Sequence, residues 1–306
     1  RIKKALHNWS LNKEFVRLAV APTIPLHCSD KFMLGCANLA REFGVGLHSH
    51  VAESKIQAVS GLRSYGRSIT AHLDKIGLLG PDFTVAHGVW LDDDDCMRLG
   101  DQGVSVAHNP GSNMRLGSGL ADARGMLQRN INVGIGTDGA NCSDNQNMYE
   151  AMRVASMVSK VQGPDQRKWL TTEEIIMAAT EGSAKTLGWK DIGRIAIGYK
   201  ADIVFLDLRS INWIPFNDPS NQLVHTEDGS SVRHVMIGGK MVVKDRLPVN
   251  VDLQGLEKKA EEARKRLARV NKPGKKLFDR LEQIVGSFCP GLALTPHHIN
   301  RYGAHF

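Results

Sequence analysis

Cysteine is scarce in this sequence, and its arrangement argues against two classes of protein. The 306 residues include five cysteines, an odd number with no CxxC pair and no regular spacing: Cys28, Cys36, Cys96, Cys142 and Cys289. A disulfide framework or a thiolate zinc site needs paired or regularly spaced cysteines, so neither is expected. This usage is typical of a reducing compartment, and we predict a cytoplasmic protein.

Long apolar stretches are missing as well. Although 42% of the residues are hydrophobic, no run approaches the roughly 20 residues of a membrane helix, and no signal-peptide pattern is present. We therefore predict a soluble globular protein with no membrane partner, large enough for one large domain or two ordinary ones.

The net charge of +7 is concentrated near the end of the chain. Residues 256–280 contain ten Lys or Arg and four Asp or Glu, which leaves only +1 for the remainder. In this segment Leu256, Ala260, Ala263, Leu267 and Val270 recur at spacings of four and three, as on one side of a helix. We expect an amphipathic helix that packs on the body of the protein and makes no nucleic-acid contact; a basic tail that binds nucleic acid is the alternative.

One pattern recurs between residues 16 and 138: a short apolar run ends in polar residues and a helix-like segment follows. Each run ends near a His or Asp, namely His27, His50, His87, His108 and Asp138. The gaps between these markers average close to the roughly 31 residues per βα unit of an eight-unit barrel. A doubly wound sheet would show the same alternation but would more often carry a glycine-rich phosphate loop in its first turn, and neither GxGxxG nor GxxxxGKS/T follows the first apolar run.

In the rest of the chain the residue pattern changes twice, from helical to strand-like and back to helical. Residues 148–160 and 171–188 read as helices. Thr171 or Thr172 could cap the start of the second helix, with Glu174 near its third position. From residue 193 a period-two alternation with glycine turns predicts strands. We divide the chain into a catalytic domain at 1–192, a small β module at 193–250 and a helical tail at 251–306.

The segment HSHVAES, residues 48–54, predicts a metal site at the end of a strand. His48 and His50 would point to the same side of that strand, as in a two-histidine chelate, and Glu53 lies beyond it. The alternative is that both histidines only pack and hydrogen-bond.

Two further strand ends add to this site. Asp138, in GTDGANCSDN, is a carboxylate suited to a Zn²⁺ or Fe²⁺ site and to accepting a proton; an Asx turn is the structural alternative. His87, in VAHGVW, would supply another imidazole at the same end of the predicted barrel.

Five spaced motifs resemble the metal-dependent amidohydrolase superfamily. The most similar group contains methylthioadenosine and S-adenosylhomocysteine deaminases, 8-oxoguanine deaminase and triazine hydrolases. Residues 193–250 resemble the β-sandwich of that group. The motifs are APTIPLHCS, HVAES, VAHGVWL, VAHNPGSNMRLGSG and VGIGTDGANCSDNQNMYEAMRVAS.

The resemblance implies an α/β fold, a (β/α)8 TIM barrel of which strands 4 to 8 are present, with one divalent ion, usually zinc and in some relatives iron. It implies His50 and Asp138 as metal ligands, with His48 as a neighbour, and Asp138 also as the base. Glu53 would protonate the ring nitrogen. His87 would hydrogen-bond the nucleophile or leaving group, and His27 would contact substrate. His108 would support the loop.

One departure from the family pattern stands out. The family's other two ligands form an HxH pair after the first barrel strand, and the sequence has no counterpart to them. We expect the chain to be part of a longer enzyme, or a gene model with a misplaced start, and to be inactive alone. Homo-oligomers are common in this group, so we expect one here.

The function that the resemblance implies is hydrolysis of a carbon–nitrogen bond other than a peptide bond, most simply deamination of an aminated purine-like or other nitrogen heterocycle. Glu53 favours this over dechlorination because ring-nitrogen protonation helps an amine to leave. The alternatives are a triazine-type amine or chloride hydrolase and a non-catalytic member of the fold.

Overall fold

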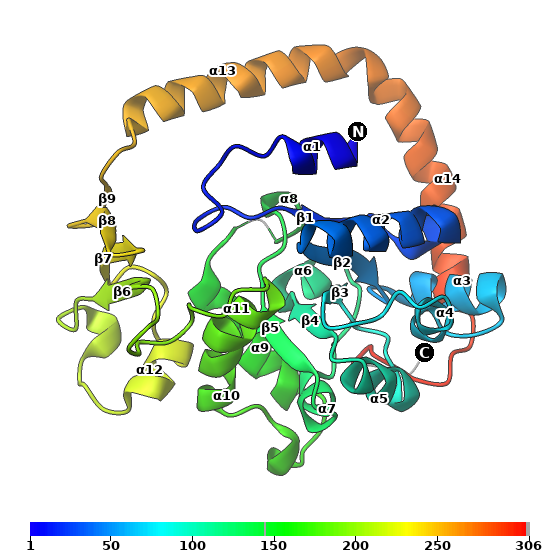
Figure 1. Ribbon diagram of the computed structural model, residues 1–306, viewed down its shortest axis with the longest axis horizontal. Helices are drawn as coiled ribbons and strands as arrows, with labels where there is room; N and C mark the ends of the chain where they lie inside the picture. The colour runs from blue at the N-terminus through cyan, green and yellow to red at the C-terminus, as the bar shows by residue number, and fades with distance from the viewer. Residues whose placement is uncertain (144, 304–306) are drawn as a thin grey trace.

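A five-stranded parallel sheet forms the centre of the computed structural model, which describes residues 1–143 and 145–303 (Figure 1). The strands lie side by side in chain order, and each is parallel to the next. They are β1 (Ala19–Val20), β2 (Gly46–Val51), β3 (Phe83–His87), β4 (Ser105–His108) and β5 (Asn132–Ile135). Sequential parallel strands joined by helices are the arrangement of successive βα units, as predicted.

Helices connect these strands. Five of them begin at a side chain that caps a main-chain N–H: Ser29, Ser54, Ser68, Asp92 and Asp122. The helices up to β5 are α1 (Ile2–His7), η1 (Pro25–His27), α2 (Asp30–Phe43), α3 (Lys55–Tyr65), α4 (Ile69–Lys75), α5 (Asp93–Asp101), α6 (Pro110–Arg115) and α7 (Ala123–Gln128).

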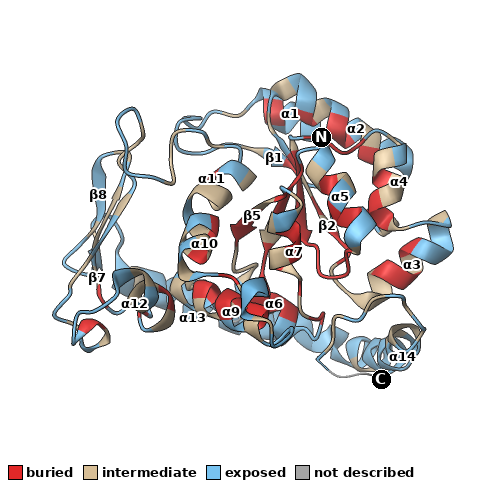
Figure 2. Cartoon of the chain, turned by 90° about the horizontal axis from the view of Figure 1, so that it is seen from below, coloured by how far each residue is buried: buried red, intermediate tan, exposed pale blue. Residues whose placement is uncertain are grey.

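The two faces of the sheet differ in chemistry. On β2, Leu47, Ser49 and Val51 are buried, whereas His48 and His50 are half-buried and point to the other side. The buried face packs on helices such as α2 in one hydrophobic core (Figure 2). The histidine face is therefore the one left for chemistry.

The helix predicted at 171–188 closes the amino-terminal end of the histidine face. It is built from α10 (Thr172–Met177), a π turn η3 (Ala178–Gly182) and α11 (Ser183–Thr186), and it follows α8 (Ala140–Ser143), α9 (Met148–Lys160) and η2 (Gln166–Lys168). Thr171 and Glu174 form the predicted capping box. Thr84 Oγ1 donates to the Thr186 carbonyl at 3.0 Å, which ties α11 to β3.

A separate antiparallel sheet follows. It comprises β6 (Ile203–Leu206), β7 (Val232–Ile237), β8 (Lys240–Lys244) and β9 (Leu247–Pro248), with η4 (Ile211–Trp213) and α12 (Pro219–His225) between its first two strands. The strand predicted from residue 193 begins only at Ile203. Gly193 and Gly198 have φ of 93° and 86°, so the chain turns there instead of pairing.

The prediction that the tail helix packs on the body is wrong. After β9, α13 (Leu253–Asn271), η5 (Lys272–Gly274) and α14 (Lys275–Ala293) form an arch along one edge of the molecule (Figure 1), and neither long helix has a buried residue. Leu256, Leu267 and Val270 are 54%, 53% and 63% exposed. Since the described residues provide no surface against this stripe, the helix is held by its own hydrogen bonds.

The chain end returns to the body beside α4 and α5 (Figure 1). All five cysteines are free thiols. Within residues 1–143 and 145–303, none of the helices has the length and apolar character needed to cross a bilayer.

Candidate active site

The carboxyl ends of three strands bring His50, His87 and Asp138 together. The rings of His50 and His87 stack with centroids 5.4 Å apart, and His87 Nε2 lies 3.9 Å from Asp138 Oδ2. All three markers follow parallel strands, so they meet at one edge of the sheet, as the barrel pattern predicts.

The His50 ring is oriented by the main chain of the loop after β1. Its Nδ1 lies 2.6 Å from the Thr23 carbonyl, which can only accept, so Nδ1 carries the proton. Nε2 is then left with a lone pair. This is the arrangement of a metal-binding imidazole held by a backbone carbonyl.

His48 lies on the same face as His50, and the two rings are edge-on with centroids 5.9 Å apart. Burial lowers the pKa of His48, and the neighbouring His50 and His87 imidazoles lower it further, while Asp138 opposes this. His48 is therefore a neutral neighbour of the cluster.

His87 is held from the opposite side by α6. It is 1% exposed, and its Nδ1 lies 2.8 Å from Asn113 Oδ1. This contact turns the other ring nitrogen toward Asp138. His87 also has φ of 74°, a conformation that non-glycine residues rarely adopt.

Asp138 is fixed by two donors. The Gly139 N–H donates to Oδ1 at 2.7 Å, and Ser112 Oγ donates to Oδ2 at 2.7 Å. Burial acts to raise the pKa of Asp138, but these hydrogen bonds and the nearby His87 and His50 outweigh it, so the pKa is lowered. Asp138 is accordingly a carboxylate at neutral pH.

Glu53 lies directly before Ser54, the N-cap of α3, and is half-buried. Gln57 Nε2 donates to its carboxylate at 3.3 Å. Burial raises the pKa of the Cys142 thiol in α8, and the nearby carboxylates of Asp138 and Glu53 raise it further. Glu53 thus stands at the rim of the cluster.

His27 and His108 lie apart from the central contacts. His27 is in η1, beside β2 and α3, and is exposed. His108 is fully buried, and within the described residues neither ring nitrogen has a hydrogen-bond partner. Burial, with the His87 ring, lowers its pKa to about 4. The predicted loop support by His108 therefore involves packing, with no hydrogen bond from its ring.

The donor chemistry of the cluster suits a divalent ion only in part. His50 Nε2 and the Asp138 carboxylate are nitrogen and oxygen donors of the kind that zinc takes. Among residues 1–143 and 145–303, no group of three or more His, Cys, Asp or Glu is arranged to hold a metal. The described residues thus offer one nitrogen and one oxygen donor here and no complete ligand set.

Several supporting residues were not predicted from the sequence. Ser112 and Asn113 lie inside one of the recognised motifs, and Thr23 lies inside another, so their position in the sequence was the available signal. Their partners depend on which loops meet across the sheet.

Two large cavities lie away from this cluster. One of about 650 Å³ is lined by Arg17, Gly46 and Thr84 near the amino-terminal strand ends, and one of about 740 Å³ lies between β5 and α10–α11. The site is therefore identified by its chemistry and not by cavity size.

The profile of the amidohydrolase family matches residues 1–242, most of the chain. The chain belongs to this family. The predicted resemblance is thereby confirmed, and relatives from the predicted group are found as well.

Among curated relatives of this amidohydrolase, 5'-deoxyadenosine deaminase of Methanosarcina mazei is 36% identical over 257 residues, 84% of this chain and 59% of the relative. The 5-methylthioadenosine/S-adenosylhomocysteine deaminase of Syntrophobacter fumaroxidans is 37% identical over 240 residues, 78% of this chain and 55% of the relative. The chain thus spans less than two thirds of the length of these relatives.

Solved structures similar to the chain include an adenosine deaminase and a triazine-type hydrolase. An adenosine deaminase from Xanthomonas campestris with bound zinc superimposes with a TM-score of 0.79 at 29% identity, over 81% of this chain and 57% of that one. Atrazine chlorohydrolase from Arthrobacter aurescens complexed with zinc has a TM-score of 0.80 at 28% identity, over 85% and 58%.

Proposed function

We propose that this amidohydrolase takes part in hydrolytic deamination of an adenosine-like or other aminated nitrogen heterocycle. The observation that carries the proposal is the convergence of His50, His87 and Asp138, with Glu53 at the rim. The deaminases that are 36% and 37% identical to the chain support it.

His50 and Asp138 would hold a divalent ion, with zinc favoured by the zinc-bound similar structures and iron as the alternative. When bound, such an ion polarises a water and lowers its pKa toward 7. The Thr23 carbonyl keeps the Nε2 lone pair of His50 available for this role.

Asp138 is suited to take the proton from the attacking water. Ser112 and the Gly139 N–H hold its oxygens, and its lowered pKa keeps it ionised before the reaction. Glu53 would give a proton to the ring nitrogen of the substrate, a general-acid role worth roughly 10²- to 10⁴-fold in rate. His87 would hydrogen-bond the nucleophile or the leaving amine, and His27 would contact the substrate.

A triazine-type amine or chloride hydrolase is the second candidate. The likeness to atrazine chlorohydrolase favours it, since its TM-score of 0.80 is close to that of the adenosine deaminase at 0.79. Glu53 argues for the deaminase, because an amine needs protonation to leave whereas chloride does not. A non-catalytic member of the fold is the remaining alternative.

The proposal has an architectural part. We propose that the five strands belong to a closed eight-stranded barrel, that β6–β9 belong to a β-sandwich, and that the domains divide at residues 192 and 250. We also propose a cytoplasmic homo-oligomer that acts on a small molecule and binds no nucleic acid.

The test is a product assay. The chain, and the chain extended by any coding sequence that precedes it, are supplied with zinc and given 5'-deoxyadenosine, 5'-methylthioadenosine, S-adenosylhomocysteine and atrazine. We expect ammonia from an adenosine-type substrate, lost in Glu53→Gln. Chloride from atrazine alone would support the second candidate, and no product from either protein would count against both.

A further inference from the structure

Residues 297–302 lie against two loops that leave the carboxyl ends of β3 and β4. The first loop, residues 88–92, begins directly after His87. The second, residues 117–122, follows α6, which carries Ser112 and Asn113. The chain end therefore contacts the supports of the candidate active site, although about two hundred residues separate them in sequence.

Contacts with the first loop involve both charge and packing. Arg301 Nη2 donates to the Leu91 carbonyl at 2.7 Å, and His298 Nε2 lies 2.7 Å from Asp92 Oδ2. The Trp90 ring meets the rings of His297 and Tyr302 edge-on, with centroids 5.7 Å and 5.1 Å away.

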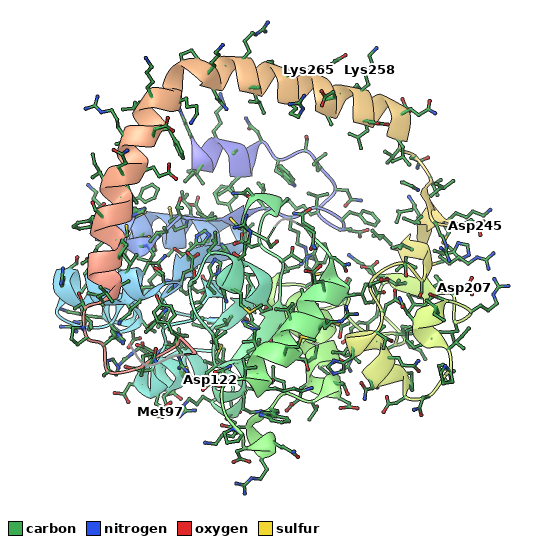
Figure 3. All side chains as sticks on the ribbon, turned by 180° about the vertical axis from the view of Figure 1, so that it is seen from behind. Met97, Asp122, Asp207, Asp245, Lys258 and Lys265 are labelled. Atoms are coloured by element: carbon green, nitrogen blue, oxygen red, sulfur yellow. The ribbon has the colours of Figure 1, made fainter. Side chains whose placement is uncertain are left out.

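Arg301 also joins the second loop. The Leu120 N–H donates to the Arg301 carbonyl at 2.8 Å, and Arg301 Nη1 lies 3.9 Å from Asp122 Oδ2. Figure 3 shows Asp122 beside the last segment of the ribbon. Gly119 has φ of 121°, and a Cβ there would come within 2.9 Å of the Arg301 carbonyl oxygen. The close approach of the two backbones thus requires glycine at this position.

The two loops are joined to each other as well. Trp90 Nε1 donates to the Ser118 carbonyl at 2.7 Å in a buried hydrogen bond. Trp90 comes from the first loop and Ser118 from the second. With Arg301 bonded to Leu91 on one side and Leu120 on the other, the chain end connects both loops in one network.

We propose that residues 297–302 form a clasp that positions His87, Ser112 and Asn113, with Arg301 as the positioning residue that joins the two loops. The clasp acts through those loops and touches no reacting atom. Its value for catalysis rests on the function proposed above, because a shift of about 1 Å at a catalytic group can cost about 100-fold in rate.

Hydrogen exchange of the full chain, measured peptide by peptide, tests the clasp without a substrate. Arg301→Ala should increase exchange in residues 88–92 and 117–122 and leave β1 and β2 unchanged. Arg301→Lys retains a charged donor for the Leu91 carbonyl and should restore most of the protection. Arg269→Ala, on the exposed helix α13, is the control.

Unchanged exchange in both loops of Arg301→Ala would overturn the clasp, as would an equal increase in every strand. If Arg301→Ala does not fold, Arg301→Lys is compared with wild type instead, and a smaller increase in exchange in residues 88–92 and 117–122 is expected. In an active preparation, Arg301→Ala should lower kcat by roughly 10- to 100-fold with little change in KM. Loosened loops in Arg301→Ala, together with no ammonia from any substrate in either the chain or its extended form, would refute the proposed function and leave the clasp standing.

Discussion

At the scale of single residues, the candidate site contains backbone conformations with positive φ, which residues other than glycine rarely adopt. Ala52, His87 and Asp138 have φ of 52°, 74° and 61°, and each stands just at or beyond the end of a strand. Such positions cost of order 1–3 kcal/mol each and persist only where the surroundings impose them. Here the surroundings are the Asn113, Ser112 and Gly139 hydrogen bonds, which turn two of these side chains toward each other.

The first prediction concerns the contact between His87 and Asn113. In Asn113→Ala, the buried His87 Nδ1 loses its partner, so the free energy of unfolding should fall by about 1–3 kcal/mol. Urea denaturation of Asn113→Ala, His87→Ala and the double variant measures the coupling between the two side chains, expected near 1 kcal/mol. Additive effects would show that the hydrogen bond contributes nothing.

The second prediction concerns pH. Burial raises the pKa of Asp95 from 3.8 to about 6, against the hydrogen bond from Ser68. The folded state therefore binds more protons than the unfolded state between these values, and stability falls as pH rises through this range and then levels off. The loss is about 3 kcal/mol.

Asp95→Asn removes this charge while keeping an acceptor for Ser68. Its advantage in free energy of unfolding over wild type should therefore be larger at about pH 7.5 than at about pH 4. Asp94→Asn, an exposed neighbour on α5, is the control for loss of a charge from the helix. The same difference at both pH values would contradict the prediction.

At the scale of elements, the connection from α10 to α11 shows how the sequence adapts a helix to a sheet. The segment at 178–182 widens to a π turn where it passes β5. Gly182 faces the strand, and Asn132 Nδ2 donates to the Gly182 carbonyl at 3.1 Å. This contact closes the histidine face at its amino-terminal end.

Gly182→Ala is the third prediction. A Cβ at this position would lie 2.2 Å from the Val133 carbonyl oxygen, a main-chain atom that cannot move alone. We expect a loss of about 1–3 kcal/mol in the free energy of unfolding. The control is Gly35→Ala in α2, where a Cβ meets nothing within 4 Å and helix propensity should add up to about 1 kcal/mol. Equal effects would refute the contact.

At the scale of the whole molecule, the arch of α13 and α14 differs from everything else in the chain. Lys258 and Lys265 project from its outer side (Figure 3), and helical spacing puts them opposite Leu256 and Ala263. The apolar stripe therefore lies on the inner side of the arch while remaining exposed. Among the described residues nothing buries it.

Hydrogen exchange should show this difference directly, which is the fourth prediction. Amides of α13 should exchange at the earliest times, because an unburied helix of this length is marginal in water, whereas β2, β3 and β4 should stay protected. Protection of α13 equal to that of β3 would show that another surface covers the stripe in solution.

Local signals in the sequence determined much of this protein. Alternating apolar runs predicted the parallel strands, and the Thr171 and Glu174 pair predicted a capping box that the structure contains. These features depend on residues close in the chain, so a single sequence is enough to predict them. The recognised motifs, confirmed by the family match, also placed His50, His87 and Asp138 at neighbouring strand ends.

Only the tertiary structure decided which groups hold these side chains and which apolar stripe is covered. Thr23, Ser112 and Asn113 contact the site from loops distant in sequence, and the Arg301 contacts span about two hundred residues. The spacing of Leu256, Leu267 and Val270 was right for a helix but wrong for packing. Periodicity fixes which side of a helix is apolar, whereas burial depends on whether another part of the molecule lies against that side.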